Sequence, residues 1–372
     1  MIVQDVITHL ETLAPLPYAE EFDNVGLLVG HKTTKLTGLL VTLDTLEEVV
    51  DEAIENQCNL IVSFHPIIFK GLKKITGNTY VERVLLKAIE HKIAIYAIHT
   101  ALDNVFEGSN SGLCDLLGLK NKAILIPQAG TIKQLTTYVP KKNADAVRTA
   151  LFTSGAGSIG NYTNCSYNSD GTGTFKGNEH SNPVIGAKHD FQKVSETKIT
   201  VSFAKHIEND ILKALFSSHP YEEVAYEVVT LENKNQHIGM GMIGQLEQPM
   251  DEISFLKFVK TRLNCSSIRH SVLLESSIQK IAVLGGSGSF AIEAAKAADA
   301  DAFITADLKY HDFFSAENKL ILVDVGHYES EQHIKNILVA HLKKIITYFA
   351  VLLSKINTNP VTYKKAWLKR KN

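Results

Sequence analysis

The fold class of this chain can be predicted from residues 38–64, GLLVTLDTLEEVVDEAIENQCNLIVSF. They open with an apolar run, residues 38–44, that is typical of a buried β-strand, and close with a second one, residues 59–64. Between the two, residues 45–57 place apolar side chains three or four positions apart among acidic ones, which is the pattern of an amphipathic helix. A strand, a helix and a strand in this order predict two parallel strands joined by a crossover helix.

The same plan continues along the chain and then returns near its end. Residues 80–92 have a helical pattern and residues 93–98, IAIYAI, read as a third strand. Strands and helices alternate again in the last hundred or so residues, where the expected strands are 280–286, 301–306 and 319–325. The fold class is therefore α/β, with two similar lobes on parallel-rich sheets. The lobes are assigned to residues 1–127 and 237–372.

The middle of the chain, residues 128–236, has a different character. Two strand-helix-strand units follow each other there, which predicts a ferredoxin-like α+β insert. A stretch rich in Gly, Asn, Ser and Thr, ending near residue 186, separates the two units.

Composition limits the function classes. A formal net charge of -2 argues against a protein that coats nucleic acid, so a nucleic-acid partner is not expected. Four cysteines without a C-x-x-C pair indicate neither a disulfide framework nor a thiolate zinc site. The longest apolar run, residues 345–354, is about half of a membrane span. We therefore expect a cytoplasmic protein without a membrane anchor.

Polar residues collect where the expected parallel strands end. Ligands of open α/β sheets bind outside the carboxyl ends of the strands, so these residues are the candidates for a site. They would converge if the two lobes pack side by side. The candidates are His65, His99, Asp103, Asp307, Lys309, His311, His327 and Glu331.

Four of these residues suit a metal site. His327 and Glu331 are four positions apart at an expected helix start, so both side chains lie on one face of the helix. Histidines and carboxylates without cysteine favour a divalent ion such as zinc, iron or manganese. The proposed ligands are His65, Asp103, His327 and Glu331, and Pro66 would restrict the backbone beside His65. A purely structural role for each histidine is the alternative.

The segment 285–291, GGSGSFA, supports a rival interpretation. Gly286, Gly288 and Ala291 match the G-x-G-x-x-A fingerprint of dinucleotide-binding folds, and Asp307 lies near the end of the next strand. A plain tight turn would give the same pattern.

Several sequence blocks together resemble the GTP cyclohydrolase type 2-like family, also called the Nif-three-like dinuclear metal-centre proteins. The resemblance covers nearly the whole chain. It implies one domain made of two lobes, a PII- or CutA-like insert, a ring-shaped homohexamer and up to two metal ions per subunit between the lobes. The implied metal ligands are again His65, Asp103, His327 and Glu331. The blocks include FDNVGLLVG, FHPIIFKG, IHTALDN, HPYEEVAYEVVTLEN, TADLKYHD, GHYESE and SKINTNP.

One position departs from this family pattern. Many bacterial relatives have His-His-Pro where this chain has Phe64-His65-Pro66. Phe64 cannot bind a metal ion, so a second ion would bind weakly, use water in that place or recruit His99.

The resemblance implies a GTP cyclohydrolase, a metal-dependent hydrolase that opens the purine ring of a nucleotide substrate. His99 or His311 would move protons, Lys309 would hold a phosphate, and the loop of Gly285, Gly286 and Gly288 would cradle phosphates. Two other functions remain open: a metal-handling or regulatory protein whose insert senses a ligand, and a metal-dependent phosphoester hydrolase.

Overall fold

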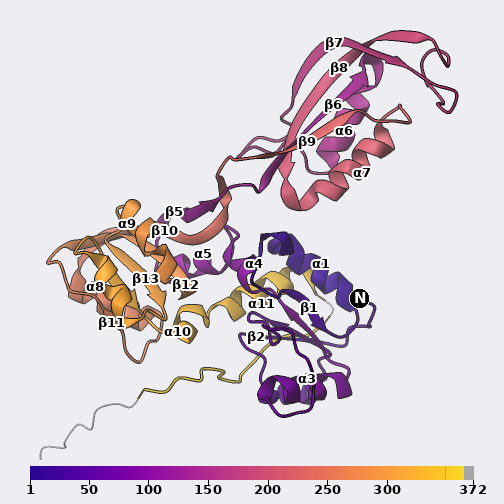
Figure 1. Cartoon of the computed structure of the whole chain (residues 1–372). Coiled ribbons are helices and arrows are strands. Elements are labelled where there is room, and N and C mark those ends of the chain that lie inside the picture. The colour runs from indigo at the N-terminus through magenta and orange to yellow at the C-terminus, as the bar shows by residue number, and fades with distance from the viewer. Residues whose placement is uncertain (348, 364–372) are drawn as a thin grey trace, which may run out of the picture. The chain divides into compact units, whose positions relative to one another are not determined.

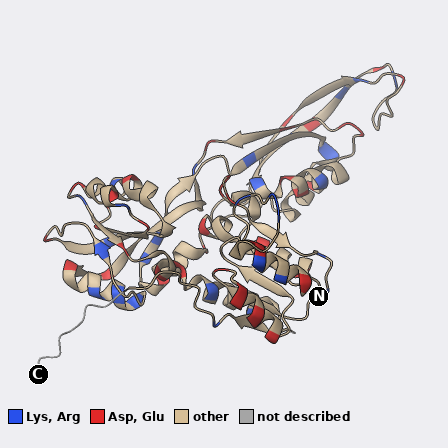
Figure 2. Ribbon diagram, turned by 60° about the horizontal axis from the view of Figure 1, so that its bottom comes forward, with Lys and Arg blue, Asp and Glu red and all other residues tan. Residues whose placement is uncertain are grey.

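The computed structural model describes residues 1–347 and 349–363. The chain forms two compact units, of which the first joins Met1–Pro127 with Gln236–Asn372 and the second is Gln128–Asn235 (Figure 1). Lys and Arg positions are interspersed with Asp and Glu positions along both units (Figure 2). No helix within the described residues is long and apolar enough to cross a membrane.

The first lobe of the larger unit is built on a five-stranded sheet in the order β1-β4-β3-β2-β15. The strands β2, β3, β4 and β15 run parallel, and β1 pairs antiparallel with β4. This confirms the parallel sheet expected from residues 38–64. The strands are β1 (Gly26–Val29), β2 (Leu39–Thr42), β3 (Leu60–Ser63), β4 (Ala94–Ala97) and β15 (Val351–Leu353).

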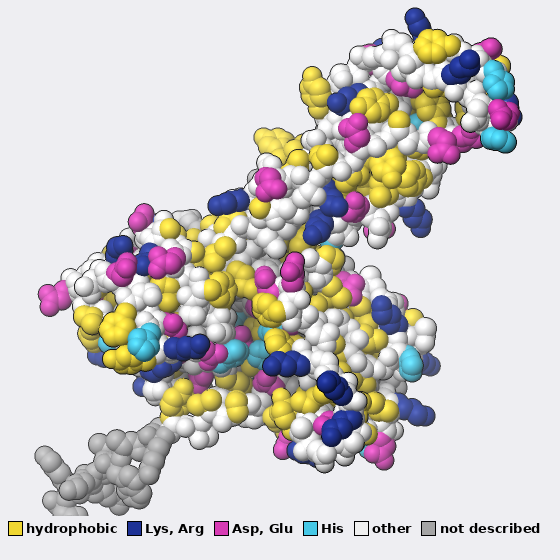
Figure 3. All heavy atoms as spheres, in the orientation of Figure 1, with side chains coloured by type: hydrophobic (Ala, Val, Ile, Leu, Met, Phe, Trp, Pro, Cys, Tyr) yellow, Lys and Arg dark blue, Asp and Glu magenta, His cyan; other side chains and the backbone are white. Residues whose placement is uncertain are grey.

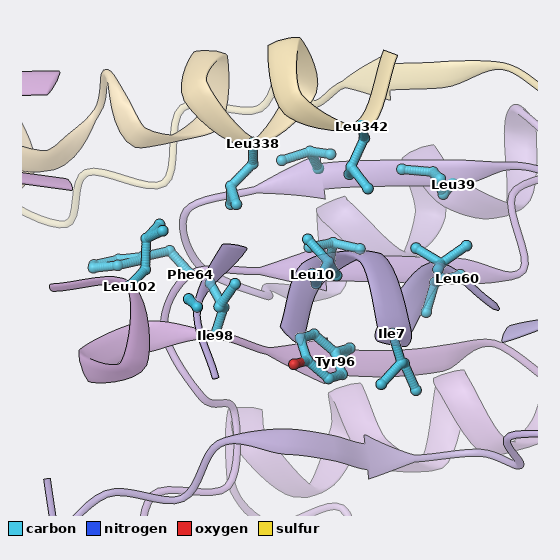
Figure 4. Packing of buried hydrophobic residues seen from close by; sticks show 14 of the residues in the cluster. Ile7, Leu10, Leu39, Leu60, Phe64, Tyr96, Ile98, Leu102, Leu338 and Leu342 are labelled. Atoms are coloured by element: carbon cyan, nitrogen blue, oxygen red, sulfur yellow. The ribbon is translucent and has the colours of Figure 1, made fainter. Parts of the chain in front are cut away.

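Helices cover both faces of this sheet. Since successive side chains of a strand point to opposite sides, each strand contributes to both cores. In β3, Leu60 and Val62 belong to a core on one face and Ile61 to a core on the other. Figure 4 shows the first of these cores, where α1 (Val3–Leu13) and α11 (Ile334–Ile345) pack over the strands. The opposite face is covered by α2 (Glu47–Glu55) and α3 (Tyr80–Glu90).

The second lobe repeats the plan on a six-stranded sheet in the order β11-β14-β13-β12-β10-β5. Its central strands β12, β13 and β14 are parallel. The helices of this lobe are α8 (Glu252–Arg262), α9 (Ile292–Ala297) and α10 (His327–Glu331). Its strands are β5 (Lys120–Gln128), β10 (Asn235–Asp251), β11 (Arg269–His270), β12 (Ser277–Ser287), β13 (Ala302–Ala306) and β14 (Ile321–Asp324).

The two lobes exchange helices. The helix α5 (Ser109–Leu116) follows the first lobe in the chain, but its Leu113 and Cys114 lie in the core of the second lobe. Conversely, α11 follows the second lobe, and its Leu338 and Leu342 lie in the core of the first. Each lobe therefore completes the other, which fixes the strand ends of both lobes around a common site.

The smaller unit has the β-α-β-β-α-β order of a ferredoxin-like fold and forms a four-stranded antiparallel sheet, β7-β8-β6-β9. Its helices are α6 (Ala144–Thr153) and α7 (Glu208–Ser218), which supply Val147, Leu151, Ile211 and Leu215 to its core. Its strands are β6 (Ile132–Pro140), β7 (Tyr167–Lys176), β8 (Phe191–Ala204) and β9 (Tyr226–Leu231).

Two elements differ from the sequence-based expectation. The sequence of residues 329–344 has the pattern of one continuous helix, but α10 ends at Glu331 and α11 begins at Ile334. In the insert, β7 forms within the polar stretch for which no strand was expected. Its side chains are mostly exposed, so they carry no apolar alternation, and the strand is held by pairing with β8 over its whole length.

Candidate metal centre

Three predicted metal ligands meet between the two lobes. His65 follows the end of β3, and His327 and Glu331 are the first and last residues of α10. The Oε2 atom of Glu331 lies 3.2 Å from Nε2 of His65 and 3.1 Å from Nε2 of His327. One potential ligand atom from each residue lies within 4.8 Å of the other two. Figure 3 shows histidine and acidic side chains in the hollow between the lobes.

A carboxylate fixes the ring of each histidine in this region. Nδ1 of His65 lies 2.8 Å from Oδ1 of Asp44, and Nδ1 of His327 lies 2.7 Å from Oδ2 of Asp307. An ionised carboxylate only accepts hydrogen bonds, so each Nδ1 carries the proton and each Nε2 is free to bind a metal ion. Histidine ligands of metal ions in proteins are held in this way.

Glu331 itself fits a metal ligand. Its side chain is buried, and its Oε2 atom is paired with the Nε2 atoms of both histidines. A buried carboxylate is costly unless a positive charge is paired with it. An ion bound by Oε2 and the two Nε2 atoms would supply this charge. Two imidazoles and one carboxylate are also a common ligand set for zinc and other divalent ions.

The charges of this cluster depend on each other. Burial would lower the pKa of both histidines, but Asp44 and Glu331 raise the pKa of His65 to about 9. In the same way, Asp307 and Glu331 raise the pKa of His327 to about 11. Burial would raise the pKa of Glu331, but the two imidazoles hold it at about 2. Without a metal ion, the cluster therefore holds two protonated imidazoles around one carboxylate.

These pKa values predict how metal binding depends on pH. A metal ion needs the neutral imidazoles, so each bound ion must displace protons from His65 and His327. Below pH 9 we expect the apparent affinity to rise with pH, by about tenfold per unit for each proton displaced. Competition with a chromogenic chelator between pH 6 and 8 measures this slope. An affinity that stays constant over this range would contradict the assignment of these ligands.

The fourth predicted ligand, Asp103, lies in the same pocket but outside the cluster of three. It is the last residue of α4 (His99–Asp103) and accepts a hydrogen bond from the hydroxyl of Ser109. Burial, together with the charge of Glu331, raises its pKa to about 7. Asp103 therefore shares the pocket with the cluster of three without belonging to it.

The pocket has a volume of about 460 Å³ and brings together most of the predicted site. His99 lines it, with its Nδ1 atom 2.8 Å from Oδ1 of Asp23. The rings of Phe22, Phe69 and Phe290 also line it, although each is well exposed. No Lys or Arg is found among the described residues of its wall. The wall includes His65, His99, Asp103, Gly285, Gly286, His327 and Glu331.

Phe64, where the family pattern has a second histidine, is fully buried in the core of the first lobe. Its ring centroid lies 5.0 Å from that of His65 and 5.4 Å from that of His99. An imidazole at this position would therefore stand beside both histidines.

The glycine loop does not have the geometry expected of a phosphate cradle. The N–H of Gly285 donates to Oδ1 of Asn110 and that of Gly286 donates to Oγ of Ser330, so neither is free for a ligand. Gly286 has a φ of +69°, and a Cβ atom there would lie 2.4 Å from Oε1 of Glu331. The loop thus makes room for Glu331.

Nothing in this loop supports the dinucleotide interpretation either. A Cβ atom at Gly288 would meet the hydroxyl of Thr305 at 2.1 Å, so this glycine serves close packing. Asp307, the expected ribose partner, is engaged by His327.

Lys309 and His311, predicted as catalytic residues, do not line this pocket. Both side chains are exposed at the 3-10 helix of Tyr310–Ala316, and the ring of His311 packs beside those of Tyr310 and Phe314. The geometry therefore gives no role in the site to either residue.

Two carboxylates of the site were not singled out from the sequence. Asp44 closes the expected strand GLLVTLD, and Asp23 lies in the block FDNVGLLVG. The strand-end position of Asp44 was a usable signal, because the same rule identified His65.

Known proteins with a similar sequence cover nearly the whole chain. The family model of Duf34/NIF3 (NGG1p interacting factor 3) matches residues 1–360. A Bacillus subtilis (strain 168) protein named GTP cyclohydrolase 1 type 2 homolog is 37% identical over 366 residues, which cover 97% of this chain and 98% of that protein. A protein of the same name from Halalkalibacterium halodurans is 39% identical over 365 residues, covering 97% and 98%.

A solved structure agrees with this assignment. The crystal structure of a Bacillus cereus protein related to NIF3 matches with a TM-score of 0.84 and 34% identity, over 98% of this chain and 99% of that one. The chain therefore belongs to the Duf34/NIF3 family.

Proposed function

We propose that this protein is a metal-dependent hydrolase whose divalent ion is held by His65, His327 and Glu331. The observation that carries the proposal is the position of the buried Oε2 atom of Glu331, 3.2 and 3.1 Å from the Nε2 atoms of His65 and His327. A divalent ion, when bound, supplies Lewis acidity and activates water.

The protein groups around this position have separable tasks. Asp44 and Asp307 orient the two imidazoles through their Nδ1 atoms. His99, oriented by Asp23, has its Nε2 atom available to move a proton to or from a substrate in the pocket. Asp103 and Glu331 together would hold a second ion.

The pocket wall favours a planar ring as the substrate. Exposed aromatic rings at a pocket mouth offer stacking surfaces for a flat ligand, and Phe22, Phe69 and Phe290 are such rings. The purine of GTP, which the names of the relatives suggest, has this shape. Hydrolysis of its two C8–N bonds would consume two water molecules and release formate.

The absence of Lys and Arg from the described wall has a consequence for GTP. A triphosphate has no Lys or Arg partner in the described wall, so a divalent ion in the cluster would be its cationic partner there. A phosphoester hydrolase stays the alternative, because a divalent ion can hold a phosphate at the reacting centre without Lys or Arg.

Formate release from metal-loaded protein tests the proposal. We expect release from GTP, and release from guanosine within about tenfold of that rate, because the described wall offers the phosphates no Lys or Arg. Glu331→Gln serves as the inactive control. If neither compound yields formate at stoichiometric protein concentration, ring opening of guanine is excluded, and an activity screen over phosphoesters then decides for or against the alternative.

Two further expectations belong to this proposal. The resemblance to the family implies a homohexamer, which light scattering at micromolar concentration would distinguish from a monomer. The insert, with its β-α-β-β-α-β order, is proposed to be a PII- or CutA-like module.

A further inference from the structure

The last described segment of the chain, Ser354–Tyr363, crosses from the first lobe to the second, and we call it the C-terminal strap (Figure 1). It begins where β15 leaves the sheet of the first lobe. The hydroxyl of Ser354 donates to Oε2 of Glu52 at 2.5 Å, and the N–H of Lys355 donates to Oε1 of Glu52 at 2.9 Å. Further along, the amide of Asn359 donates to Oε1 of Glu329 in α10 at 3.3 Å.

Between these two anchors the strap contacts the environment of the metal centre. The hydroxyl of Thr358, which is 5% exposed, donates to Oδ2 of Asp44 at 2.6 Å. The other oxygen of the same carboxylate, Oδ1, lies 2.8 Å from Nδ1 of His65. Both oxygens of Asp44 are thus engaged, one by the strap and one by a candidate metal ligand.

The strap also closes a second pocket behind the two histidines. This pocket has a volume of about 420 Å³, and His65, His327 and Asp44 line it together with residues of the strap. The strap residues in its wall are Asn359, Pro360, Val361 and Tyr363. The histidine pair therefore separates this pocket from the one with the aromatic rings.

A similar arrangement supports His99, but from neighbours in the chain. The hydroxyl of Thr100 donates to Oδ2 of Asp23 at 2.5 Å, while Oδ1 of Asp23 lies 2.8 Å from Nδ1 of His99. In both cases a threonine hydroxyl donates to one oxygen of an aspartate whose other oxygen lies beside a histidine Nδ1 atom. The difference is that Thr358 is 314 positions away from Asp44.

We propose that Thr358 is a positioning residue of the metal centre, which holds Asp44 and through it the Nε2 atom of His65 in the direction of Glu331. The inference rests on the metal-binding part of the proposed function. The side chain of Asp44 is 33% exposed, so without Thr358 it can rotate toward solvent and leave Nδ1 of His65. The metal centre is then complete only after the C-terminal strap has docked.

The variant Thr358→Val tests this step, because it removes the hydroxyl and keeps the shape. Partners of metal-bound histidines typically contribute 10- to 100-fold to metal affinity, and we expect a loss of about tenfold for this variant. Thr358→Ser keeps the hydroxyl and should stay within about threefold of the parent. The affinity is measured with Co²⁺ by chelator competition, and the visible spectrum of the bound Co²⁺ reports the ligand geometry.

Thr197→Val is the matched control in the insert. Thr197 is 6% exposed and donates to Oδ1 of Asp170 at 2.9 Å, so the variant removes the same kind of bond in the other compact unit. It should leave Co²⁺ affinity and spectrum unchanged. Thermal unfolding of each metal-free variant shows whether a loss of affinity accompanies a loss of the fold.

A double-mutant cycle with Asp44→Asn separates positioning from general packing. If Thr358 acts through Asp44, the combined variant binds Co²⁺ no more weakly than Asp44→Asn alone, within about twofold. If the affinity losses of the two single variants multiply in the combined variant, or if Thr358→Val keeps the affinity and spectrum of the parent, the role of Thr358 is overturned. The proposed function would not be affected. A parent chain that binds no divalent ion would overturn the proposed function and this inference together.

Discussion

Glu331→Gln is expected to lower the affinity for a divalent ion by at least about 100-fold, because a ligand contributes more than the outer-shell groups that support it. Glutamine keeps the shape of the side chain, so the buried position at the end of α10 stays filled. The substitution removes the negative charge beside His65 and His327 and replaces one carboxylate oxygen by an NH₂ group, which cannot bind a metal ion. Elemental analysis of the purified protein and titration of the metal-free protein with Zn²⁺ measure the effect.

Glu329→Gln provides the matched control for this change. Glu329 lies on the same helix and is also buried, but it pairs with Asn359 and does not belong to the ligand cluster. Its variant should bind metal within about threefold of the parent, since an amide oxygen can still accept from Asn359. Parent-like metal content in Glu331→Gln would remove the central residue of the proposed site.

Phe64→His is expected to raise the bound metal from about one ion per chain toward two, since each ion commonly takes about three protein ligands. The parent cluster supplies three ligands to one ion, and another would have only Asp103 and a shared Glu331. The new imidazole would stand beside His65 and His99 and add the missing ligand. In the purified parent we expect one firmly bound ion and a second one that is largely lost.

Phe64→His is also expected to destabilise the metal-free protein. Phe64 is fully buried, and an imidazole without a hydrogen-bond partner there should lower the free energy of unfolding of the metal-free protein by about 2 kcal/mol. Bound metal should restore part of this loss. Phe64→Leu, which stays apolar, should lose stability without gaining an ion. Two equally tight sites in the parent chain, measured by titration, would contradict the prediction.

Local sequence patterns determined the central strands and the helices that cross between them. The expected strands at residues 38–44, 59–64 and 93–98 correspond to β2, β3 and β4, and the family resemblance is confirmed. These strands were visible because both of their faces are buried, which requires uninterrupted apolar runs. In contrast, β7 lies at a sheet edge with exposed side chains, so only its pairing partner β8 specifies it.

For the site, candidate metal ligands could be predicted from the sequence, because strand ends of a parallel sheet face a common edge and a four-residue spacing places His327 and Glu331 on one helix face. Which of these candidates meet follows from the packing of the two lobes. Lys309 and His311 also follow a strand, but the chain leads them to the surface. The link from Thr358 to Asp44 depends on the return of the chain to the first lobe, where β15 pairs with β2, whereas Asp44 and His65 follow the neighbouring strands β2 and β3. Contacts between residues hundreds of positions apart leave no periodic signal in a sequence, since they are fixed by packing rather than by local backbone preference.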